Sequence, residues 1–413
     1  MSALATILLL VAAMLLVPCT VLLVQVLAAL SVSKQDAMAG PDAGAGAGAG
    51  LTISPTIDVC LLMPAHNEAG GIAEVLRALL PQLGPRTHLL LVADNCTDAT
   101  ADIARQIAGD ARFVKIIERH DPELRGKGYA LDHGVRYLKS TPPSVVLVLD
   151  ADCTLKPGSI DALAMLCMTT GRPVQALDLM QAPTDGSTKT RLAEFAWLVK
   201  NQVRALGYHQ LGLPCQLMGT GMAFTWSHIS QAKLNTGQIV EDMQLGIDLA
   251  RNGAPPLFCP DALVTSVFPT AAEGLQSQRT RWEHGHLGVI VAQVPRLFWQ
   301  SLTGANSALF AMALDLCVPP LALLTLLTVG TWVAGIALAA VGAGVLPMLV
   351  AGVATTMLAL AVMLAWWRFG RNVISLRQLC QIPLYVLAKI PLYFYFLVKR
   401  QSVWVRSKRD GEA

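Results

Sequence analysis

The two ends of the chain are apolar over lengths that match a lipid bilayer. Residues 2–33 include no charged residue, and residues 316–367 include none over more than fifty positions. A helix needs about 20 apolar residues to cross a bilayer. The first segment therefore predicts one transmembrane helix within residues 1–33, and the second predicts two helices with a turn near residues 342–344. A cleaved signal peptide, the alternative for the first segment, would have a basic start and a shorter apolar core.

A third apolar stretch, residues 381–398, is interrupted by Lys389 and Pro391. It either spans the membrane or lies in the interface. The tail at residues 401–413 is basic, and basic segments favour the cytoplasmic face, although a plain solvated tail is the alternative. If this stretch crossed the membrane, the basic tail would emerge on the side opposite to the cytoplasm, against the preference of basic segments. We therefore favour an interfacial or re-entrant element. The C-terminal membrane region is then residues 291–400, with two or three helices.

Between its apolar ends the chain has the composition of an ordinary globular domain. The 413 residues are 54% hydrophobic and 14% charged, and the apolar excess is concentrated at the ends. We expect a Gly/Ala-rich linker at residues 34–50 and one domain at residues 51–290. The net charge of +3 is too small to indicate nucleic-acid binding. Nine cysteines without CxxC spacing predict neither a disulfide framework nor a zinc site, and they fit a cytosolic domain.

Short apolar runs alternate with helical patterns through the middle region, which is typical of an α/β domain built on a parallel sheet. Residues 145–149 are entirely apolar, as expected for a central strand buried on both faces. We predict further strands at residues 59–63, 88–92, 113–117, 174–180 and 216–225. We predict helices near residues 72–83, from about residue 99, between the last two strands, and at residues 242–252 with a stop at Gly253.

Asp150 and Asp152 follow the predicted strand at residues 145–149. In open α/β sheets, ligands bind beyond the carboxyl ends of the strands. A spacing of two along extended backbone points both carboxylates to one side. Such oxygen ligands suit Mg²⁺ or Mn²⁺, which would bridge the phosphates of a donor and neutralise a leaving diphosphate. A bare DxD also occurs by chance, and its place after a central strand is what favours a metal site.

Polar residues also follow the first two predicted strands. Asp94 closes the second strand, where it could hold a base or a ribose. Asn95 or Thr97 could equally cap the next helix, and Asp98 could do so while Asp94 stays functional. Glu68 follows the first strand and could meet the nucleotide, although an ordinary strand-to-helix turn explains this segment as well.

Two glycine-containing segments allow close approach of a ligand. Arg125 and Lys127 alternate with glycines, which suits a phosphate contact, and a solvated basic loop is the alternative. Gly219 and Thr220 lie in a second glycine-rich segment, where the backbone can approach a ligand. We place Gly219 and Thr220 on the acceptor side of the expected site.

Glu241 and Asp242 open a predicted helix. The helix dipole stabilises a carboxylate there, so we expect it to stay ionised. An ionised carboxylate suits a general base that deprotonates an acceptor hydroxyl. Acidic residues are favoured in the first turn of any helix, so a purely structural role explains the pair equally well.

The segment Gln278-Arg279-Thr280-Arg281-Trp282 precedes the second apolar region. On a helix, Gln278, Arg281 and Trp282 share one face. Arg281 can grip a diphosphate through its bidentate fork, and Trp282 offers a platform on which an acceptor sugar can stack. An interfacial Arg/Trp helix beside the bilayer is the alternative.

In this order, these clusters resemble the motifs of family 2 membrane glycosyltransferases, which include polysaccharide synthases and lipid glycosyltransferases. The resemblance covers about residues 59–288 and the flanking membrane helices. It implies an α/β fold of the GT-A (Rossmann-like) type, inverting transfer from a nucleotide sugar, and a divalent metal, Mg²⁺ or Mn²⁺. It also implies a role for each motif: a nucleotide contact at Asp94, the metal site at Asp150 and Asp152, the base at Asp242, and a clamp over diphosphate and acceptor at Gln278, Arg281 and Trp282.

The sequence departs from the family pattern in three ways. Val240 stands where many members have Thr before the Glu-Asp pair, and Asn95 stands where many have a second acid. Processive synthases usually have more membrane helices than this sequence shows. Transfer of one or a few sugars to a lipid acceptor is therefore an alternative to polymer synthesis.

We expect an inverting glycosyltransferase that uses a UDP- or GDP-linked sugar and a lipid or glycan acceptor, in exopolysaccharide or cell-envelope glycan synthesis. We expect an integral protein of the bacterial inner membrane whose catalytic domain is cytoplasmic, where nucleotide sugars are made. A non-catalytic nucleotide-binding membrane scaffold is a further alternative. A nucleotidyltransferase would share the fold and the acids, but it would not explain the QxxRW segment or the anchors.

Overall fold

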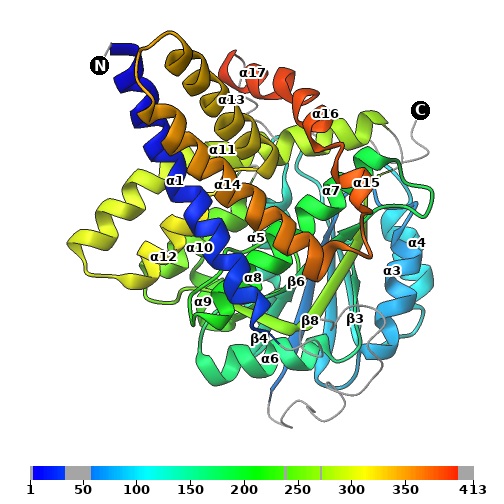
Figure 1. Ribbon diagram of the computed structural model, residues 1–413. Coiled ribbons are helices and arrows are strands. Elements are labelled where there is room, and N and C mark those ends of the chain that lie inside the picture. Colours follow the sequence, from blue (N-terminus) through cyan, green and yellow to red (C-terminus); the bar gives the residue numbers. More distant parts are fainter. Residues whose placement is uncertain (1–2, 33–56, 237–239, 270–271, 399–413) are drawn as a thin grey trace. The chain divides into compact units, whose positions relative to one another are not determined.

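The computed structural model describes residues 3–32, 57–236, 240–269 and 272–398, without the side chains of residues 272–279 and 397–398 (Figure 1). The predicted linker at residues 34–50 and the predicted tail at residues 401–413 lie outside the described residues. The chain divides into two compact units. The sheet unit takes its described residues from Ser33–Gln181 and Pro214–Arg281. The helical unit takes them from Met1–Val32, Ala182–Leu213 and Trp282–Gln401.

The described part of the sheet unit is built on one eight-stranded sheet, in the order β3-β2-β1-β4-β7-β6-β8-β5. The strands are β1 (Val59–Ala65), β2 (Thr87–Asp94), β3 (Val114–Arg119), β4 (Val145–Val148), β5 (Thr154–Leu155), β6 (Val174–Gln181), β7 (Met222–Thr225) and β8 (Leu257–Val267). The first four are mutually parallel where they pair, with β1 between β2 and β4. The carboxyl ends of β1, β2 and β4 therefore meet at one edge of the sheet.

The predicted parallel pairing is confirmed for β1 to β4, and the sheet as a whole is mixed, because β7 runs antiparallel to both β4 and β6, and β5 runs antiparallel to β8. The strand predicted at residues 216–225 is also shorter than expected. It begins at Met222 because Gly219 and Gly221 have positive φ angles of 98° and 63°, which do not fit extended backbone. β5 and β8 have no counterpart among the strands predicted from the sequence.

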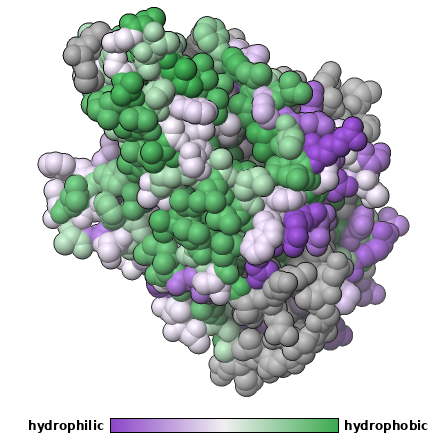
Figure 2. All heavy atoms as spheres, in the orientation of Figure 1, coloured by the Kyte–Doolittle hydropathy of each residue, from purple (hydrophilic) through white to green (hydrophobic). Residues whose placement is uncertain are grey.

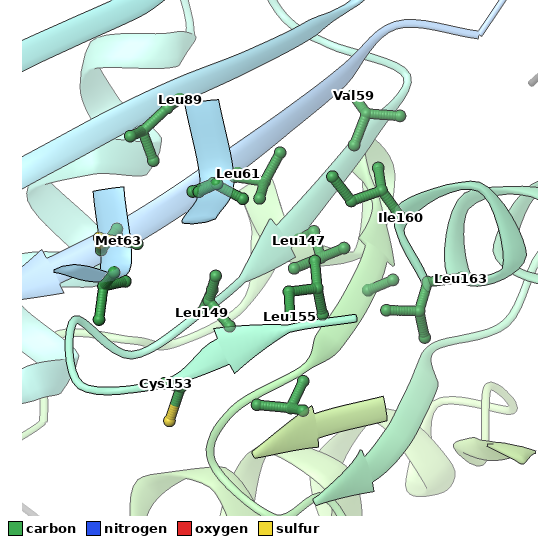
Figure 3. Packing of buried hydrophobic residues seen from close by; sticks show 14 of the residues in the cluster. Val59, Leu61, Met63, Leu89, Leu147, Leu149, Cys153, Leu155, Ile160 and Leu163 are labelled. Carbon is green, nitrogen blue, oxygen red and sulfur yellow. The ribbon is translucent and has the colours of Figure 1, made fainter. Parts of the chain in front are cut away.

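The core of the sheet unit lies on both faces of the sheet, and alternate residues of one strand face opposite sides. On β1, Leu61 and Met63 belong to the cluster that includes side chains of α3, α4 and α6 (Figure 3). Cys60 and Leu62 belong to the other cluster, which includes side chains of α5, α9 and α10. The helices of this unit are α3 (Ile72–Leu79), α4 (Thr100–Ala108), α5 (Lys127–Leu138), α6 (Ser159–Thr170), α9 (Trp226–Gln231) and α10 (Glu241–Arg251). This three-layer arrangement confirms the predicted α/β class.

The helical unit contains long apolar helices, as predicted. Among the residues that the structure describes, four segments are long and apolar enough to cross a membrane by length and composition: Ala3–Leu30, Leu321–Ala340, Leu346–Gly370 and Leu376–Phe396. They include α1 (Ala3–Leu30), α13 (Leu321–Ala340) and α14 (Leu346–Ala365), and α1 packs along α14. Figure 2 shows apolar side chains on the surface of these helices. The turn predicted near residues 342–344 is present, with positive φ at Gly342 and Gly344.

The fourth apolar segment is divided into three short helices, α15 (Leu376–Leu379), α16 (Ile382–Leu387) and α17 (Ile390–Val398). Pro383 and Pro391 stand in the first turns of α16 and α17, where the missing N–H does no harm. Length and composition alone do not separate a crossing segment from an interfacial one. The interfacial or re-entrant element remains a prediction.

Shorter helices complete the helical unit. They are α7 (Thr188–Leu198), a π-helical turn (Val199–Val203), α8 (Arg204–Gln210) and α12 (Ser307–Leu316). A second π-helical turn (Trp366–Gly370) extends α14. The long helix α11 (Ala272–Thr303) contains the boundary between the two units, which falls between Arg281 and Trp282.

Candidate active site

Asp150 and the glycine-rich turn before β7 lie at the same edge of the sheet. Val148, the last residue of β4, pairs with Met222, the first residue of β7. Because β7 is antiparallel, the segment before it meets the segment after β4. The Asp150 N–H donates to Thr220 Oγ1 at 3.1 Å, which joins the two segments directly.

Lys127, Asp150, Gly219 and Asp242 converge at this edge. Lys127 is the first residue of α5, and its Nζ lies 2.5 Å from Asp150 Oδ1. The same Nζ donates to the Gly219 carbonyl at 2.8 Å. A Cβ at Gly219 would lie 3.3 Å from Asp242 Oδ2. Four segments distant in sequence thus form one compact site, and the structure places Asp150, Asp242, Lys127, Gly219 and Thr220 together.

The site holds one ammonium group among several carboxylates. Burial would lower the pKa of Lys127, but Asp150, Glu241 and Asp242 outweigh burial and raise it. Burial raises the pKa of Asp150, with Asp152 and Asp242 adding to the rise and Lys127 opposing it. Lys127 therefore stays positively charged. In the resting protein it counters the negative charge of the carboxylates at this edge of the sheet.

Glu241 differs from the expectation for an acid at a helix start. It does begin α10, as predicted. However, burial, and then the neighbouring Asp242, raise its pKa to about 7. The prediction that the helix dipole keeps a carboxylate here ionised was wrong for Glu241, because burial and like charge outweigh the dipole.

Asp150 and Asp152 are able to hold a divalent cation. Ligand atoms of Asp150, Asp152 and Cys153 lie within 4.8 Å of one another. Burial, together with both neighbouring carboxylates, raises the pKa of the Cys153 thiol well above its usual range, so this side chain stays protonated. A donor set of carboxylates without a thiolate suits Mg²⁺ or Mn²⁺ rather than zinc.

Asp94 is fixed at the end of β2 by a partner that the sequence reading missed. Arg119, the last residue of β3, donates to Asp94 Oδ1 at 2.6 Å, and both side chains are nearly buried. Asn95 Nδ2 donates to the same oxygen at 3.1 Å. The register of β2 and β3, which pairs Asp94 with Arg119, brings this cation to the carboxylate. No sequence motif indicates such a pair, because it depends on strand register.

The loops after β1 and β2 are tied together by hydrogen bonds. Asn67 Nδ2 donates to Thr97 Oγ1 at 3.0 Å, and the Glu68 N–H donates to Thr100 Oγ1 at 2.7 Å. Asp98 Oδ1 accepts the N–H of Thr100, the first residue of α4, while the N-cap position itself is Ala99. Glu68 is 9% exposed. Glu68, on the loop after β1, and Asp94, at the end of β2, are thus both held at the carboxyl end of the sheet.

Arg125 does not join the acidic site. Its side chain is exposed, and its Nε donates to the Pro122 carbonyl at 2.8 Å. The predicted basic loop is therefore divided: Lys127 enters the site as the start of α5, and Arg125 remains on the surface.

Gln278, Arg281 and Trp282 all lie in α11. The prediction that this segment is helical is therefore confirmed. The side chain of Gln278 lies outside the described residues. Trp282 belongs to the helical unit and packs against Trp197, with ring centroids 4.9 Å apart and planes tilted by 45°. Trp197 is a second residue that the sequence reading missed, because nothing in its local sequence marks it.

The chain matches the family model described as "Glycosyltransferase like family 2" over residues 55–285. Among curated proteins it is 26% identical over 250 residues to a probable glycosyltransferase, YdaM, of Bacillus subtilis (strain 168), covering 58% of each chain. It is 22% identical to the poly-beta-1,6-N-acetyl-D-glucosamine synthase of Staphylococcus epidermidis, covering 62% of this chain and 60% of the relative. The chain thus spans less than two thirds of the length of these relatives.

Two further comparisons agree with the family. The chain is 32% identical over 103 residues to the beta-monoglucosyldiacylglycerol synthase of Synechocystis, covering 24% of this chain and 21% of the relative. The fold resembles the solved structure of the mannosyltransferase PcManGT from Pyrobaculum calidifontis, in complex with GDP-Man and Mn²⁺. That likeness has a TM-score of 0.57 at 19% identity and covers 95% of this chain and 100% of the other.

The fold is accordingly the predicted GT-A type. The family model covers more than half of the chain, including the convergent acids, Lys127 and the segment from Gln278 to Trp282. This protein therefore belongs to glycosyltransferase family 2.

Proposed function

We propose that this glycosyltransferase moves a sugar, with inversion at C1, from a UDP- or GDP-linked donor to a membrane-associated acceptor in exopolysaccharide or cell-envelope glycan synthesis. The observation that carries the proposal is the convergence of Lys127, Asp150 and Asp242 around Gly219. Membrane association is supported by the four candidate spans, and the cytoplasmic inner-membrane placement is part of the proposal.

Each residue of the site has a role in this proposal. Asp242 takes the proton from the acceptor hydroxyl as that oxygen attacks the sugar C1 from the face opposite the diphosphate. The bond from C1 to the diphosphate breaks with its electron pair, and the nucleotide diphosphate leaves. Lys127 counters charge beside the phosphates, and Asp94 and Glu68 contact the nucleotide. Gly219 and Thr220, with Glu241 and Trp282, form the acceptor side, and Gln278 and Arg281 hold the diphosphate.

Asp150 and Asp152 would hold Mg²⁺ or Mn²⁺, which neutralises the charge of the diphosphate when bound. The carboxylate donor set and the protonated Cys153 thiol support this choice. The solved mannosyltransferase structure with the same fold contains GDP-Man and Mn²⁺.

Replacement of Asp242 by Asn tests the proposed base. The substitution keeps the shape of the side chain and removes its basicity, so we expect sugar transfer to fall by at least about a hundredfold, in the range found for a general base. Nucleotide binding is expected to remain. Asp248→Asn is the matched control, because Asp248 lies on the same helix, is half exposed and pairs with Arg251. Transfer at the wild-type rate in Asp242→Asn would remove Asp242 from this role.

A single transfer to a lipid acceptor is a second candidate. It is supported by the sequence similarity to a beta-monoglucosyldiacylglycerol synthase. Sizing of the product separates the candidates: one added sugar on a lipid supports single transfer, and a ladder of lengths supports polymer synthesis.

A further inference from the structure

Lys127 contacts the same carboxylate that the proposed metal site requires. Its Nζ lies 2.5 Å from Asp150 Oδ1 and donates to the Gly219 carbonyl at 2.8 Å. Ligand atoms of Asp150, Asp152 and Cys153 lie within 4.8 Å of one another, so the same aspartate belongs to the candidate cation site. The Asp150 side chain is 33% exposed, so ions can reach it from solvent. One carboxylate therefore serves both an ammonium group and a site for a divalent ion.

An ammonium group and a divalent ion at one carboxylate oppose each other. Divalent ions bind carboxylate oxygens at about 2.0–2.6 Å. An ion on Asp150 Oδ1 would thus lie within about 5 Å of Lys127 Nζ, and like charges this close repel strongly in a half-buried site. The charge of Lys127 also faces Glu241 and Asp242, which would otherwise attract a cation. Lys127 therefore lowers the affinity of this edge of the sheet for a divalent ion.

The start of α5 is held in place, and the Lys127 side chain can change partners. Gly128, the next residue, packs against the backbone of residues 234–236. A Cβ at Gly128 would overlap the Leu234 carbonyl oxygen and would lie 2.9 Å from the Thr236 carbonyl oxygen. The ammonium group, in contrast, is carried on a flexible four-carbon stem. It can move from Asp150 to another nearby anion without movement of the helix.

We propose that Lys127 and the divalent ion compete for Asp150, and that the diphosphate of the donor ends this competition by drawing the Lys127 ammonium to its own oxygens. Charge-assisted bonds to phosphate oxygens replace the bond to Asp150. Asp150 is then available to the ion, so ion and nucleotide bind tightly only together. This role rests on the donor and the metal site of the proposed function, and it makes Lys127 the residue that couples them.

A purely structural ion pair between Lys127 and Asp150 is the alternative. In that case, removal of the lysine charge would lower stability and leave the affinity for a divalent ion unchanged or lower. Competition requires the opposite change in affinity, because the ion gains Asp150 and loses a neighbouring positive charge. Metal binding therefore separates the two roles, and it does so without any measurement of sugar transfer.

Mn²⁺ binding without nucleotide or sugar tests the competition. The full chain is placed in phosphatidylcholine nanodiscs, whose lipids carry no net charge, and free Mn²⁺ is measured by electron paramagnetic resonance. Lys127→Gln removes the charge and keeps a donor for the Gly219 carbonyl. We expect Lys127→Gln to bind Mn²⁺ about ten- to a hundredfold more tightly than wild type, as for coupled neighbouring sites. Lys127→Arg keeps the charge and should bind Mn²⁺ as weakly as wild type does.

Arg125→Gln is the matched control. Arg125 is an exposed cation in the same loop, and its Nε donates to the Pro122 carbonyl instead of an acid of the site. Its replacement should leave the Mn²⁺ affinity unchanged. The double variant Lys127→Gln with Asp152→Asn should lose the affinity that Lys127→Gln gains, because Asp152 belongs to the cation site.

Addition of UDP or GDP tests the part played by the diphosphate. A nucleotide that draws Lys127 away should raise the Mn²⁺ affinity of wild type by a larger factor than that of Lys127→Gln. This measurement on wild type stands even where a variant does not fold. The same Mn²⁺ affinity of wild type with and without each nucleotide would overturn the coupling.

A Mn²⁺ affinity of Lys127→Gln equal to or below that of wild type would overturn the competition and leave a structural ion pair. An equal gain in Arg125→Gln would also overturn it, because the effect would then reflect net charge alone. Since the first titration contains neither nucleotide nor sugar, absence of glycosyltransfer by this protein would contradict only the proposed function.

Discussion

At the scale of single residues, the site depends on one cation among carboxylates. Lys127 contacts Asp150 and the Gly219 carbonyl, and its charge also faces Glu241 and Asp242. Without a donor phosphate, this ammonium balances part of the negative charge. Burial and the neighbouring Asp242 nevertheless raise the pKa of Glu241 to about 7, which places its titration in the physiological range.

Glu241→Gln tests this electrostatic balance through stability. The folded pKa of about 7 lies above the usual value of 4.5, so the folded protein binds this proton more tightly than the unfolded chain does. The contribution of Glu241 to stability therefore falls as the pH rises from about 4.5 to 7. Gln titrates nowhere in this range. The melting temperature of Glu241→Gln relative to wild type should rise between pH 5 and pH 7 and level off by about pH 8.

Glu74→Gln is the matched control for this experiment, since Glu74 is exposed on α3. Its melting temperature should differ from that of wild type by the same amount at each pH. If the difference in melting temperature between Glu241→Gln and wild type were also the same at each pH, the pKa of Glu241 would not be raised.

The acids of the site could be predicted from the sequence, and their partners could not. Asp150 and Asp242 could be predicted because one follows an apolar strand and the other opens a helix, and both signals are local. Arg119 and the contact of Lys127 with Gly219 could not, because both depend on which strands and helices lie side by side. The raised pKa of Glu241 has the same origin, since burial is a property of the folded chain.

At the scale of elements, the antiparallel strand β7 builds the site. It brings residues 218–221 to the end of β4, and Gln175 on β6 fixes this turn through the Met218 N–H and the Thr220 carbonyl, both at 2.8 Å. The alternation of apolar runs predicted β1 to β4 and β6. It did not reveal the direction of β7, because strand direction has no local signal, nor β8, whose run is interrupted by Pro260 and Asp261.

Gly219→Ala tests the close approach at this turn. Gly219 has a φ of 98°, and a Cβ there would lie 3.3 Å from Asp242 Oδ2 and 3.8 Å from Lys127 Nζ. A shift of the turn by a fraction of an ångström would misplace both groups, so we expect turnover of the nucleotide sugar to fall about ten- to a hundredfold.

Gly253→Ala is the matched control for the backbone strain. Gly253 has a similar φ of 86°, and a Cβ there would meet nothing within 4 Å. Both variants should lose about 1–2 kcal/mol of stability from the left-handed backbone. Only Gly219→Ala should lose activity, and equal activity in the two variants would mean that this turn does not contribute to the site.

At the scale of the whole molecule, buried polar groups link helices of the helical unit that are far apart in sequence. Arg204 on α8 donates to Gln25 Oε1 on α1 at 3.1 Å and to Asp315 Oδ1 on α12 at 2.7 Å. Gln25 Nε2 donates to the same Asp315 oxygen at 2.7 Å. The sequence predicts α1 as a single anchor and does not indicate these partners, because Gln25 and Asp315 stand singly within apolar runs and Arg204 lies far from both in the chain.

Arg204→Met tests this network. The change leaves the Asp315 carboxylate buried without its cation, which costs about 3–5 kcal/mol in comparable cases. We expect a clearly lower melting temperature in nanodiscs. The double variant Arg204→Met with Asp315→Asn should recover part of the loss, because the uncompensated charge is removed. A wild-type melting temperature for Arg204→Met would show that the network does not stabilise the unit.

The central claim, that the convergent acids transfer sugar from a nucleotide donor, is tested most directly by release of nucleotide diphosphate. The purified chain in nanodiscs would be incubated with Mg²⁺ or Mn²⁺, a native lipid extract and a panel of UDP- and GDP-sugars. We predict release from one donor that requires the cation and the lipid and is lost in Asp242→Asn. Nucleotide binding without release from any donor would contradict the claim and would favour a membrane scaffold.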